Sequence, residues 1–128
     1  MKAKFKLTLA VLAGAALGAA AIQGLNAQGK PAVYLIEEID ISNPDAFANE
    51  FLPLIQAANK AAGVRALAAG GKTIAIEGAP PKSRVAIQIW DSIESIQAFR
   101  SSAAYKDARK VADKYATYRT FTVEGLPQ

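Results

Sequence analysis

Apolar and polar positions alternate with the period of a strand in several segments of the chain. Residues 32–39 (AVYLIEEI) are rich in β-branched and aromatic side chains, and residues 84–90 and 118–124 alternate strictly. Residues 64–69 and 73–77 flank Gly70-Gly71-Lys72, a pattern typical of a hairpin turn. The pattern therefore predicts strands in all five segments.

Helical spacing follows the first predicted strand. Asn43 has the side chain of an N-cap, Pro44 suits the first helical position, and apolar residues then recur every three or four positions up to Gly63. Because Pro53 lies inside this pattern, we expect a kink or a break into two shorter helices.

A second helical region follows residue 90. Asp91 and Glu94 have the spacing of an N-cap and its capping-box partner, and this predicts a helix that begins at Asp91. A further helical stretch carries apolar residues on one face between Tyr105 and Tyr115.

Four of the five strands and the helices fit the order β-α-β-β-α-(α)-β, which predicts an α+β protein with the ferredoxin-like split βαβ plan, in which helices cover one face of an antiparallel sheet. We expect the other face to carry Trp90, Gln88, Tyr34 and either Leu67 or Ala66. Because such a face is too apolar for open water, a second copy of the chain is expected to cover it. The predicted assembly is a homodimer.

Composition excludes several kinds of chemistry. The 128 residues include no Cys and no His, and the only Met is Met1. Disulfides, thiolate nucleophiles, Ser-His-Asp triads and Cys- or His-ligated metals are therefore excluded. No phosphate-binding loop or nucleotide fingerprint is present, so no cofactor and no metal are expected.

The N-terminus has the pattern of a secretory signal. Lys2, Lys4 and Lys6 precede an apolar stretch from Leu7 to Ile22, and Ala27 offers a small residue for cleavage. An uncleaved membrane anchor is the alternative, but the apolar stretch is shorter than the roughly 20 residues that a span requires. We expect a signal peptide at residues 1–27, one domain at residues 28–128, and a periplasmic or secreted protein that meets the membrane only transiently.

Removing the signal changes the charge balance. The whole chain has 15 Lys and Arg against 11 Asp and Glu, and three of the Lys residues belong to the leader. The mature chain is therefore nearly neutral, and no nucleic-acid partner is expected.

Short motifs occur in an order and spacing that point to a known family. They are Asn43-Pro44-Asp45-Ala46-Phe47, Gly63-Val64-Arg65, Ile76-Glu77-Gly78, Trp90-Asp91-Ser92, Ser102-Ala103-Ala104-Tyr105-Lys106 and Val123-Glu124-Gly125. With them the chain resembles the domain-of-unknown-function 1330 family (DUF1330), from about residue 32 to residue 125. It departs from the family at Phe47, where Tyr is usual, and at Ala112, where Arg is common.

The resemblance implies a dimer of ferredoxin-like units, with a cavity between sheet and helices or between the subunits. The wider dimeric α+β barrel superfamily includes cofactor-free mono-oxygenases, isomerases and haem-dependent enzymes, so the fold does not choose a reaction.

The most suggestive side chains for a site share one strand face. Arg84, Gln88 and Trp90 offer a cationic fork, an amide and an indole, which suit a small aromatic or carboxylate-bearing ligand. The alternative is that these residues pack in the dimer interface. Tyr34 and Arg65, on neighbouring strands, are further candidates for the same cavity, and the favoured alternative is that they lie in the core or at the rim.

Acidic residues cluster at the end of the first predicted strand. One of Glu37, Glu38 and Asp40 could act as a general base if it is buried, whereas the alternative is solvated or ion-paired carboxylates. Glu37 and Glu38 occupy opposite strand faces and cannot share one site, and Glu38 is retained as a candidate ligand-binding residue. Tyr105 is interpreted as helix packing, and Arg109 as part of a solvated helix surface.

Three functions stay open at this point. The leading hypothesis is an exported homodimer that binds a small organic molecule in a barrel cavity. The alternatives are a cofactor-independent isomerase or mono-oxygenase-like enzyme, and a purely structural or interaction protein.

Overall fold

The structure, a computed structural model, describes residues 30–127. The signal peptide predicted at residues 1–27 lies outside the described residues. None of the helices in the described part combines the length and the apolar composition that a membrane span requires.

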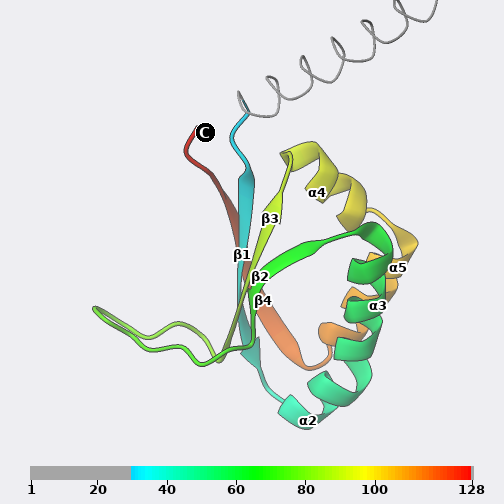
Figure 1. The fold of residues 1–128 in the computed structure, drawn as a ribbon. Helices are drawn as coiled ribbons and strands as arrows, with labels where there is room; N and C mark the ends of the chain where they lie inside the picture. The colour runs from blue at the N-terminus through cyan, green and yellow to red at the C-terminus, as the bar shows by residue number, and fades with distance from the viewer. Residues whose placement is uncertain (1–29, 128) are drawn as a thin grey trace, which may run out of the picture. The chain divides into compact units, whose positions relative to one another are not determined.

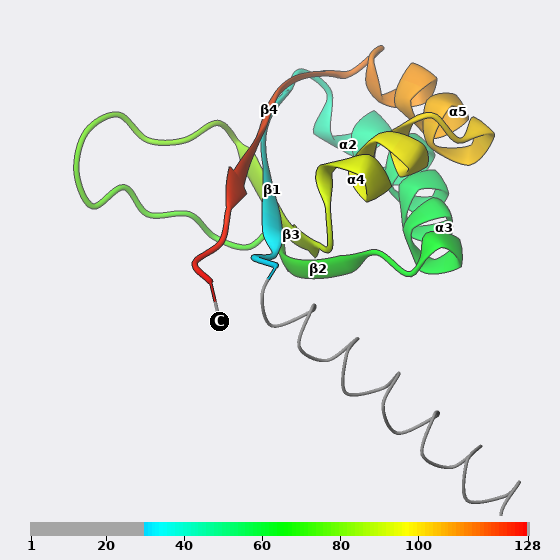
Figure 2. The same cartoon turned by 90° about the horizontal axis from the view of Figure 1, so that it is seen from above.

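Residues Ala32–Gly125 form one compact unit. Its elements, in order, are β1 (Val33–Ile41), α2 (Pro44–Ala46), a π-helical turn η1 (Phe47–Phe51), α3 (Leu52–Ala62), β2 (Arg65–Ala69), β3 (Arg84–Trp90), α4 (Ile93–Arg100), α5 (Ala103–Ala112) and β4 (Ala116–Glu124). The strands lie in the order β2-β3-β1-β4, and every neighbouring pair is antiparallel. All helices lie on one side of the sheet (Figures 1 and 2), which confirms the predicted ferredoxin-like α+β fold.

The first helical region begins and breaks as the sequence predicts. Asn43 accepts a hydrogen bond from the Ala46 backbone N–H at 3.1 Å, and Pro44 occupies the first turn. The helix passes through η1 and resumes as α3 just before Pro53, because a proline has no N–H to continue the bonding of the preceding turn. Gly63, at φ +70°, ends α3 in the left-handed conformation.

The predicted start of the second helical region is wrong by one residue. Ser92, rather than Asp91, is the N-cap of α4, and its partner in the capping box is Ser95 rather than Glu94. The Ser92 hydroxyl accepts from the Ser95 N–H at 3.1 Å, while the Ser95 hydroxyl accepts from the Ser92 N–H at 3.3 Å. Serine serves as well as aspartate at this position, so the two starting points could not be told apart from residue types.

The strand predicted at residues 73–77 does not form. Residues 70–83, here called the arm, project from the sheet on the side away from the helices (Figures 1 and 2). β2 pairs with β3 rather than with residues 73–77, so the hairpin predicted around Gly70-Gly71-Lys72 does not form. Ile74 and Ile76 in the arm are 69% and 93% exposed.

The expected second face is right for Tyr34 and Leu67 and wrong for Gln88 and Trp90. Strand alternation holds, but Gln88 and Trp90 lie on the face that the helices cover, together with Leu35 and Glu37. The prediction failed for these two residues because a cavity between sheet and helices accommodates their polar groups on the covered side.

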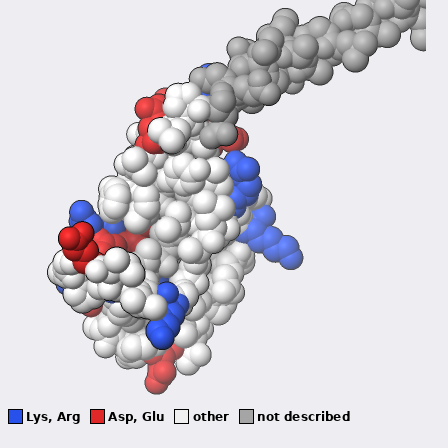
Figure 3. All heavy atoms as spheres, turned by 60° about the vertical axis from the view of Figure 1, so that its left-hand side comes forward, with Lys and Arg blue, Asp and Glu red and all other residues white. Residues whose placement is uncertain are grey.

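The opposite side, here called the open face, is largely apolar. It carries Tyr34, Ile36, Leu67, Val85, Ile87, Ile89, Phe121 and Val123. Phe121 is 42% exposed and Val123 is 52% exposed. The space-filling view from this side shows few charged side chains over its middle (Figure 3). The expectation of an apolar second face therefore holds, although most of the residues that form it differ from those predicted.

The core has two clusters, one on each side of Glu37 along β1. The first joins Ile39 to Phe47 and Phe51, whose rings lie 4.9 Å apart, and to small residues of α5. The second joins Val33 and Leu35 to Ile96 of α4. α3 packs mainly on α5 and η1 rather than on the sheet, and space remains between the sheet and the helices.

Candidate functional site

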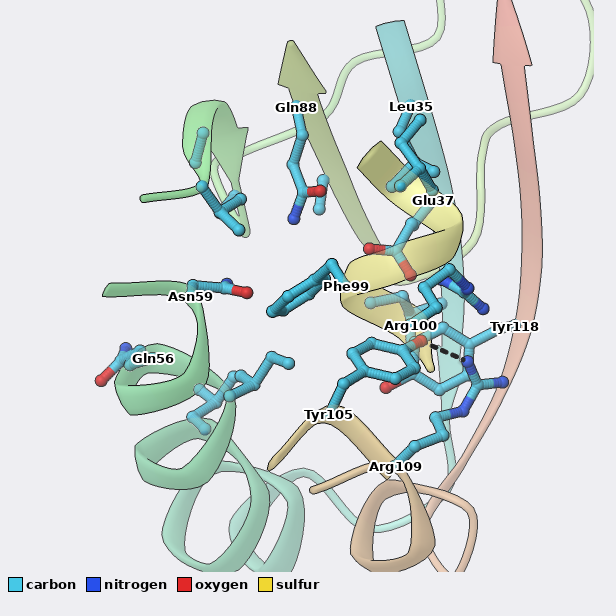
Figure 4. Close-up of a pocket in the computed structure, with 18 of the residues that line it drawn as sticks. Leu35, Glu37, Gln56, Asn59, Gln88, Phe99, Arg100, Tyr105, Arg109 and Tyr118 are labelled. Carbon is cyan, nitrogen blue, oxygen red and sulfur yellow. Dashed lines mark hydrogen bonds between the residues drawn. The ribbon is translucent and has the colours of Figure 1, made fainter. Parts of the chain in front are cut away.

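A cavity of about 450 Å³ occupies this space between the sheet and the helices. All four strands contribute to its wall, together with η1, α3, α4 and α5 (Figure 4). Apolar side chains form most of the wall, and small alanines of β2 and β3 form one side of it. The polar groups that line it are Glu37, Gln56, Asn59, Lys60, Arg84, Gln88, Arg100, Tyr105, Arg109 and Tyr118.

Glu37 is the only acidic side chain that residues 30–127 contribute to the wall. Its carboxylate points from β1 into the cavity (Figure 4). Burial raises the pKa of the Glu37 carboxyl above its ordinary value, although the positive charges of Arg100 and Arg109 oppose the shift. None of the ion pairs formed within residues 30–127 includes Glu37. The group is therefore a carboxylate without a salt-bridge partner, held in a mostly apolar cavity.

Three arginines provide positive charge around it: Arg84 from β3, Arg100 from α4 and Arg109 from α5. The Arg100 guanidinium lies over the Tyr105 ring at 4.8 Å from its centroid, and Arg109 lies over the Tyr118 ring at 3.7 Å. These stacked positions hold both guanidinium groups beside the cavity.

Two hydrogen bonds fix the position of the Arg109 guanidinium. Its Nε donates to Asp113 Oδ1 at 2.8 Å, and its Nη1 donates to the Tyr105 hydroxyl at 3.2 Å, drawn as a dashed line in Figure 4. The Tyr105 hydroxyl thus accepts from Arg109, and its own proton is directed elsewhere. An arginine held in this way presents a fixed positive charge to a ligand.

Aromatic rings form a continuous strip along the wall. Phe99 lies 5.6 Å from Trp90 and 5.3 Å from Tyr105, centroid to centroid, and the second pair meets edge to face. The Trp90 indole N–H donates to Gln88 Oε1 at 2.9 Å, so this hydrogen bond fixes the orientation of the Gln88 side-chain amide. A flat ring could lie between this strip and the alanine side of the wall.

Two buried polar atoms in the wall have no hydrogen-bond partner within the described part of the chain. They are Asn59 Oδ1 on α3 and the Tyr118 hydroxyl on β4. Burial raises the pKa of Tyr118, so its hydroxyl keeps its proton at neutral pH and is available as a donor. Because an unpaired buried polar group costs free energy, both atoms favour a polar ligand that would pair with them.

Arg84 reaches the cavity because of a glycine. Gly70 has φ +74°, and a Cβ placed on it would collide with the Arg84 guanidinium. Gly70 also donates its N–H to the Val85 carbonyl at 3.0 Å, which starts the arm. Glycine suits this position because of its positive φ, and a Cβ here would require the flexible end of the Arg84 side chain to move.

Three of the six predicted site residues line the cavity. Arg84, Gln88 and Trp90 come together there, on one face of β3. Whether they bind a ligand stays a prediction.

The other three predicted residues lie outside the cavity. Tyr34 is on the open face, and Glu38, also on that face, pairs with Arg119. Arg65 forms an exposed ion pair with Asp91 at 3.4 Å. The prediction failed because it placed Tyr34 on the same sheet face as Gln88 and Trp90. The odd positions of β1 face the cavity with them, and the even positions face away.

Sequence reasoning missed several residues of the wall. Glu37 shares the alternation of Val33, Leu35 and Ile39, and this signal could have placed it on the covered face. The helices contribute three more residues to the wall, Arg100, Tyr105 and Arg109. No sequence pattern shows how far these helices stand from the sheet. Within the described residues no group of three or more acidic side chains, Cys or His is arranged to hold a metal ion.

The family comparison agrees with the motifs in the sequence. The model described as "Domain of unknown function (DUF1330)" matches residues 32–126, which include every strand and helix named above. A comparison with curated proteins gave no significant match.

Solved structures share the fold. A protein of unknown function from Rhodopseudomonas palustris is 13% identical with a TM-score of 0.56, over 77% of this chain and 85% of that chain. A dimeric protein of unknown function and ferredoxin-like fold from Bacteroides fragilis is 12% identical with a TM-score of 0.52, over 73% and 95%. SnoaB, a cofactor-independent oxygenase from Streptomyces nogalater, is 7% identical with a TM-score of 0.52, over 77% and 96%. At these identities the likeness extends to the fold alone.

Proposed function

Because the chain belongs to the DUF1330 family, whose description names no activity, we propose its function from the cavity: the protein binds a small, flat organic anion between its sheet and its helices. One observation carries the proposal. A cavity of about 450 Å³ brings three arginines and a single carboxylate together with a strip of aromatic rings.

The size and lining suit a molecule of one or two rings. Sites for small molecules usually measure about 300–1,000 Å³ and combine apolar walls with a few polar groups. The strip of Trp90, Phe99 and Tyr105 offers ring faces and edges for stacking. Arginine pairs with a carboxylate through two parallel hydrogen bonds, and the excess of positive charge favours an anion.

Two further parts of the proposal concern assembly and location. We expect a second copy of the chain to cover the open face, since a face with Ile87 and Phe121 is costly in water and a structural neighbour is dimeric. We also propose export, on the leader pattern of residues 1–27. An oxygenase function rests on the shared fold of SnoaB and on no residue of this chain.

The binding experiment uses the natural reporter in the cavity wall. Trp90 is the only tryptophan in the chain, so its fluorescence reports on this site alone. The protein is titrated with benzoate, salicylate, phenylacetate and cinnamate, and affinities are measured by calorimetry. We expect cinnamate to change the Trp90 emission and to bind about tenfold or more tightly than its neutral amide, cinnamamide.

Matched arginine variants locate the binding. Arg100→Gln, in the cavity wall, should weaken cinnamate binding about tenfold, while Arg65→Gln, in an exposed ion pair, should leave it unchanged. Unchanged Trp90 emission with every acid, or equal binding of acid and amide, would contradict the proposal.

A further inference from the structure

Ligand binding alone leaves Glu37 without an explanation. A cavity that selects anions has no use for a carboxylate at its centre, since that carboxylate repels the ligand and is costly to bury. The neighbouring position on β1, Glu38, lies on the open face and is paired with Arg119. Glu37 is thus distinguished by being placed in the cavity and outside every described ion pair.

We infer that the protein is an enzyme in which Glu37 is the catalytic base, accepting a proton from the carbon next to the carbonyl group of an enolisable aromatic anion, such as an aryl-substituted 2-oxo acid. The inference rests on the proposed function, because the same cavity must first bind the anion. It names the substrate class and adds a reaction, the interconversion of keto and enol forms.

The step balances without any co-reactant. The C–H bond of the substrate breaks, the proton forms an O–H bond with the Glu37 carboxylate, and the electron pair moves to the carbonyl oxygen as an enolate. Return of the proton to the oxygen gives the enol, and return to the carbon gives the ketone. In D₂O, deuterium from the solvent replaces the proton on the Glu37 carboxyl, so each cycle can leave a deuterium on the carbon.

The wall contains groups that would stabilise the enolate oxygen. The Tyr118 hydroxyl is buried, protonated and has no hydrogen-bond partner among residues 30–127, and Arg100 contributes positive charge from the same wall. Arg109, fixed by Asp113 and Tyr105, is placed to hold the carboxylate of the substrate. One site thus offers a base, a donor for the developing charge and an anchor for the fixed charge.

The surroundings of Glu37 also determine how the rate should depend on pH. The proton transfer requires the ionised carboxylate, so the rate should rise as Glu37 loses its proton and then level off. Burial raises the pKa of Glu37, and the inflection should therefore lie above the ordinary range of a glutamate. The charged and titratable groups around the cavity are Lys60 from α3, Arg84 from β3, Arg100 from α4, Tyr105 and Arg109 from α5, and Tyr118 from β4.

The experiment follows deuterium exchange at the carbon next to the ketone of phenylpyruvate, by proton NMR in D₂O, with buffer alone as the background. The wild-type protein should exchange this position faster than buffer. Glu37→Gln should lower the exchange rate about a hundredfold or more and still bind cinnamate, which has no enolisable carbon. Glu38→Gln, the matched control on the neighbouring residue, should exchange at the wild-type rate.

The outcomes separate this inference from the binding proposal. If the wild-type protein binds cinnamate but exchanges phenylpyruvate no faster than buffer, the catalytic role is refuted and the binding proposal stands. Exchange by Glu37→Gln at the wild-type rate would also refute it. If neither cinnamate nor phenylpyruvate binds, both proposals fail.

Discussion

Replacing Glu37 by glutamine should stabilise the empty protein at neutral pH. The carboxylate lies in a mostly apolar cavity, and its raised pKa shows that the folded protein favours the protonated form. Glutamine keeps the shape of the protonated acid and removes the charge. A buried polar group left without full compensation costs about 1–3 kcal/mol, so Glu37→Gln should raise the free energy of unfolding by an amount in that range.

The sign of the effect should depend on pH. Below the ordinary pKa of glutamate, the carboxyl is neutral in both the folded and the unfolded protein, and wild type and variant should be similar. As the pH rises, the unfolded chain loses the proton first, which stabilises the unfolded wild type and lowers its free energy of unfolding. The advantage of Glu37→Gln should therefore grow with pH and become constant above the raised pKa of Glu37.

Urea unfolding at a series of pH values from acid to neutral measures this difference. With a urea dependence of about 2 kcal/mol per molar, the variant's midpoint should rise by roughly 0.5–1.5 M at neutral pH. Glu38→Gln is the control, and loss of its pair with Arg119 should lower the free energy of unfolding by about 0.2–1 kcal/mol. A Glu37→Gln variant that loses stability relative to wild type as the pH rises would refute the reasoning.

Two further substitutions test the parts of the fold that build the cavity. Gly70→Ala should cost about 1–2 kcal/mol from its positive φ and weaken cinnamate binding by displacing Arg84, whereas Gly71→Ala, which meets no atom within 4 Å, should do neither. Urea unfolding and calorimetry measure the two effects, and equal behaviour of the two variants would contradict the role given to Gly70. Phe47→Ala should lower the free energy of unfolding by about 3–5 kcal/mol, because Phe47 is 2% exposed in the core, and a loss below 1 kcal/mol would contradict that placement.

The elements of the fold were predictable where local chemistry determines them. Strict alternation located β3, and the Asn43-Pro44 start, Pro53 and Gly63 located the first helical region with its break. The strand predicted at residues 73–77 did not form because local composition favours a strand without showing which segment pairs with β2, and β3 is the segment that does.

The site was only half predictable for a related reason. Alternation correctly placed Arg84, Gln88 and Trp90 on one face, but it does not say which face the helices cover. The covered face, and the separation between α3 and the sheet that leaves room for the cavity, are both tertiary properties of helix packing. Arg100 and Tyr105 reach the cavity from helices. In the sequence, their spacing is the same as that of residues in ordinary helix packing or on a solvated helix surface, so it does not mark them as site residues.

Methyl NMR on two adjacent residues of β3 tests the location of binding most directly. Ala86 lines the cavity, and Ile87 lies on the open face, so their methyl groups report separately on the two sides of one sheet. Titration with cinnamate should shift the Ala86 methyl signal and leave that of Ile87 in place. A shift of the Ile87 methyl signal with an unchanged Ala86 signal would place the ligand on the open face and contradict a binding site between sheet and helices.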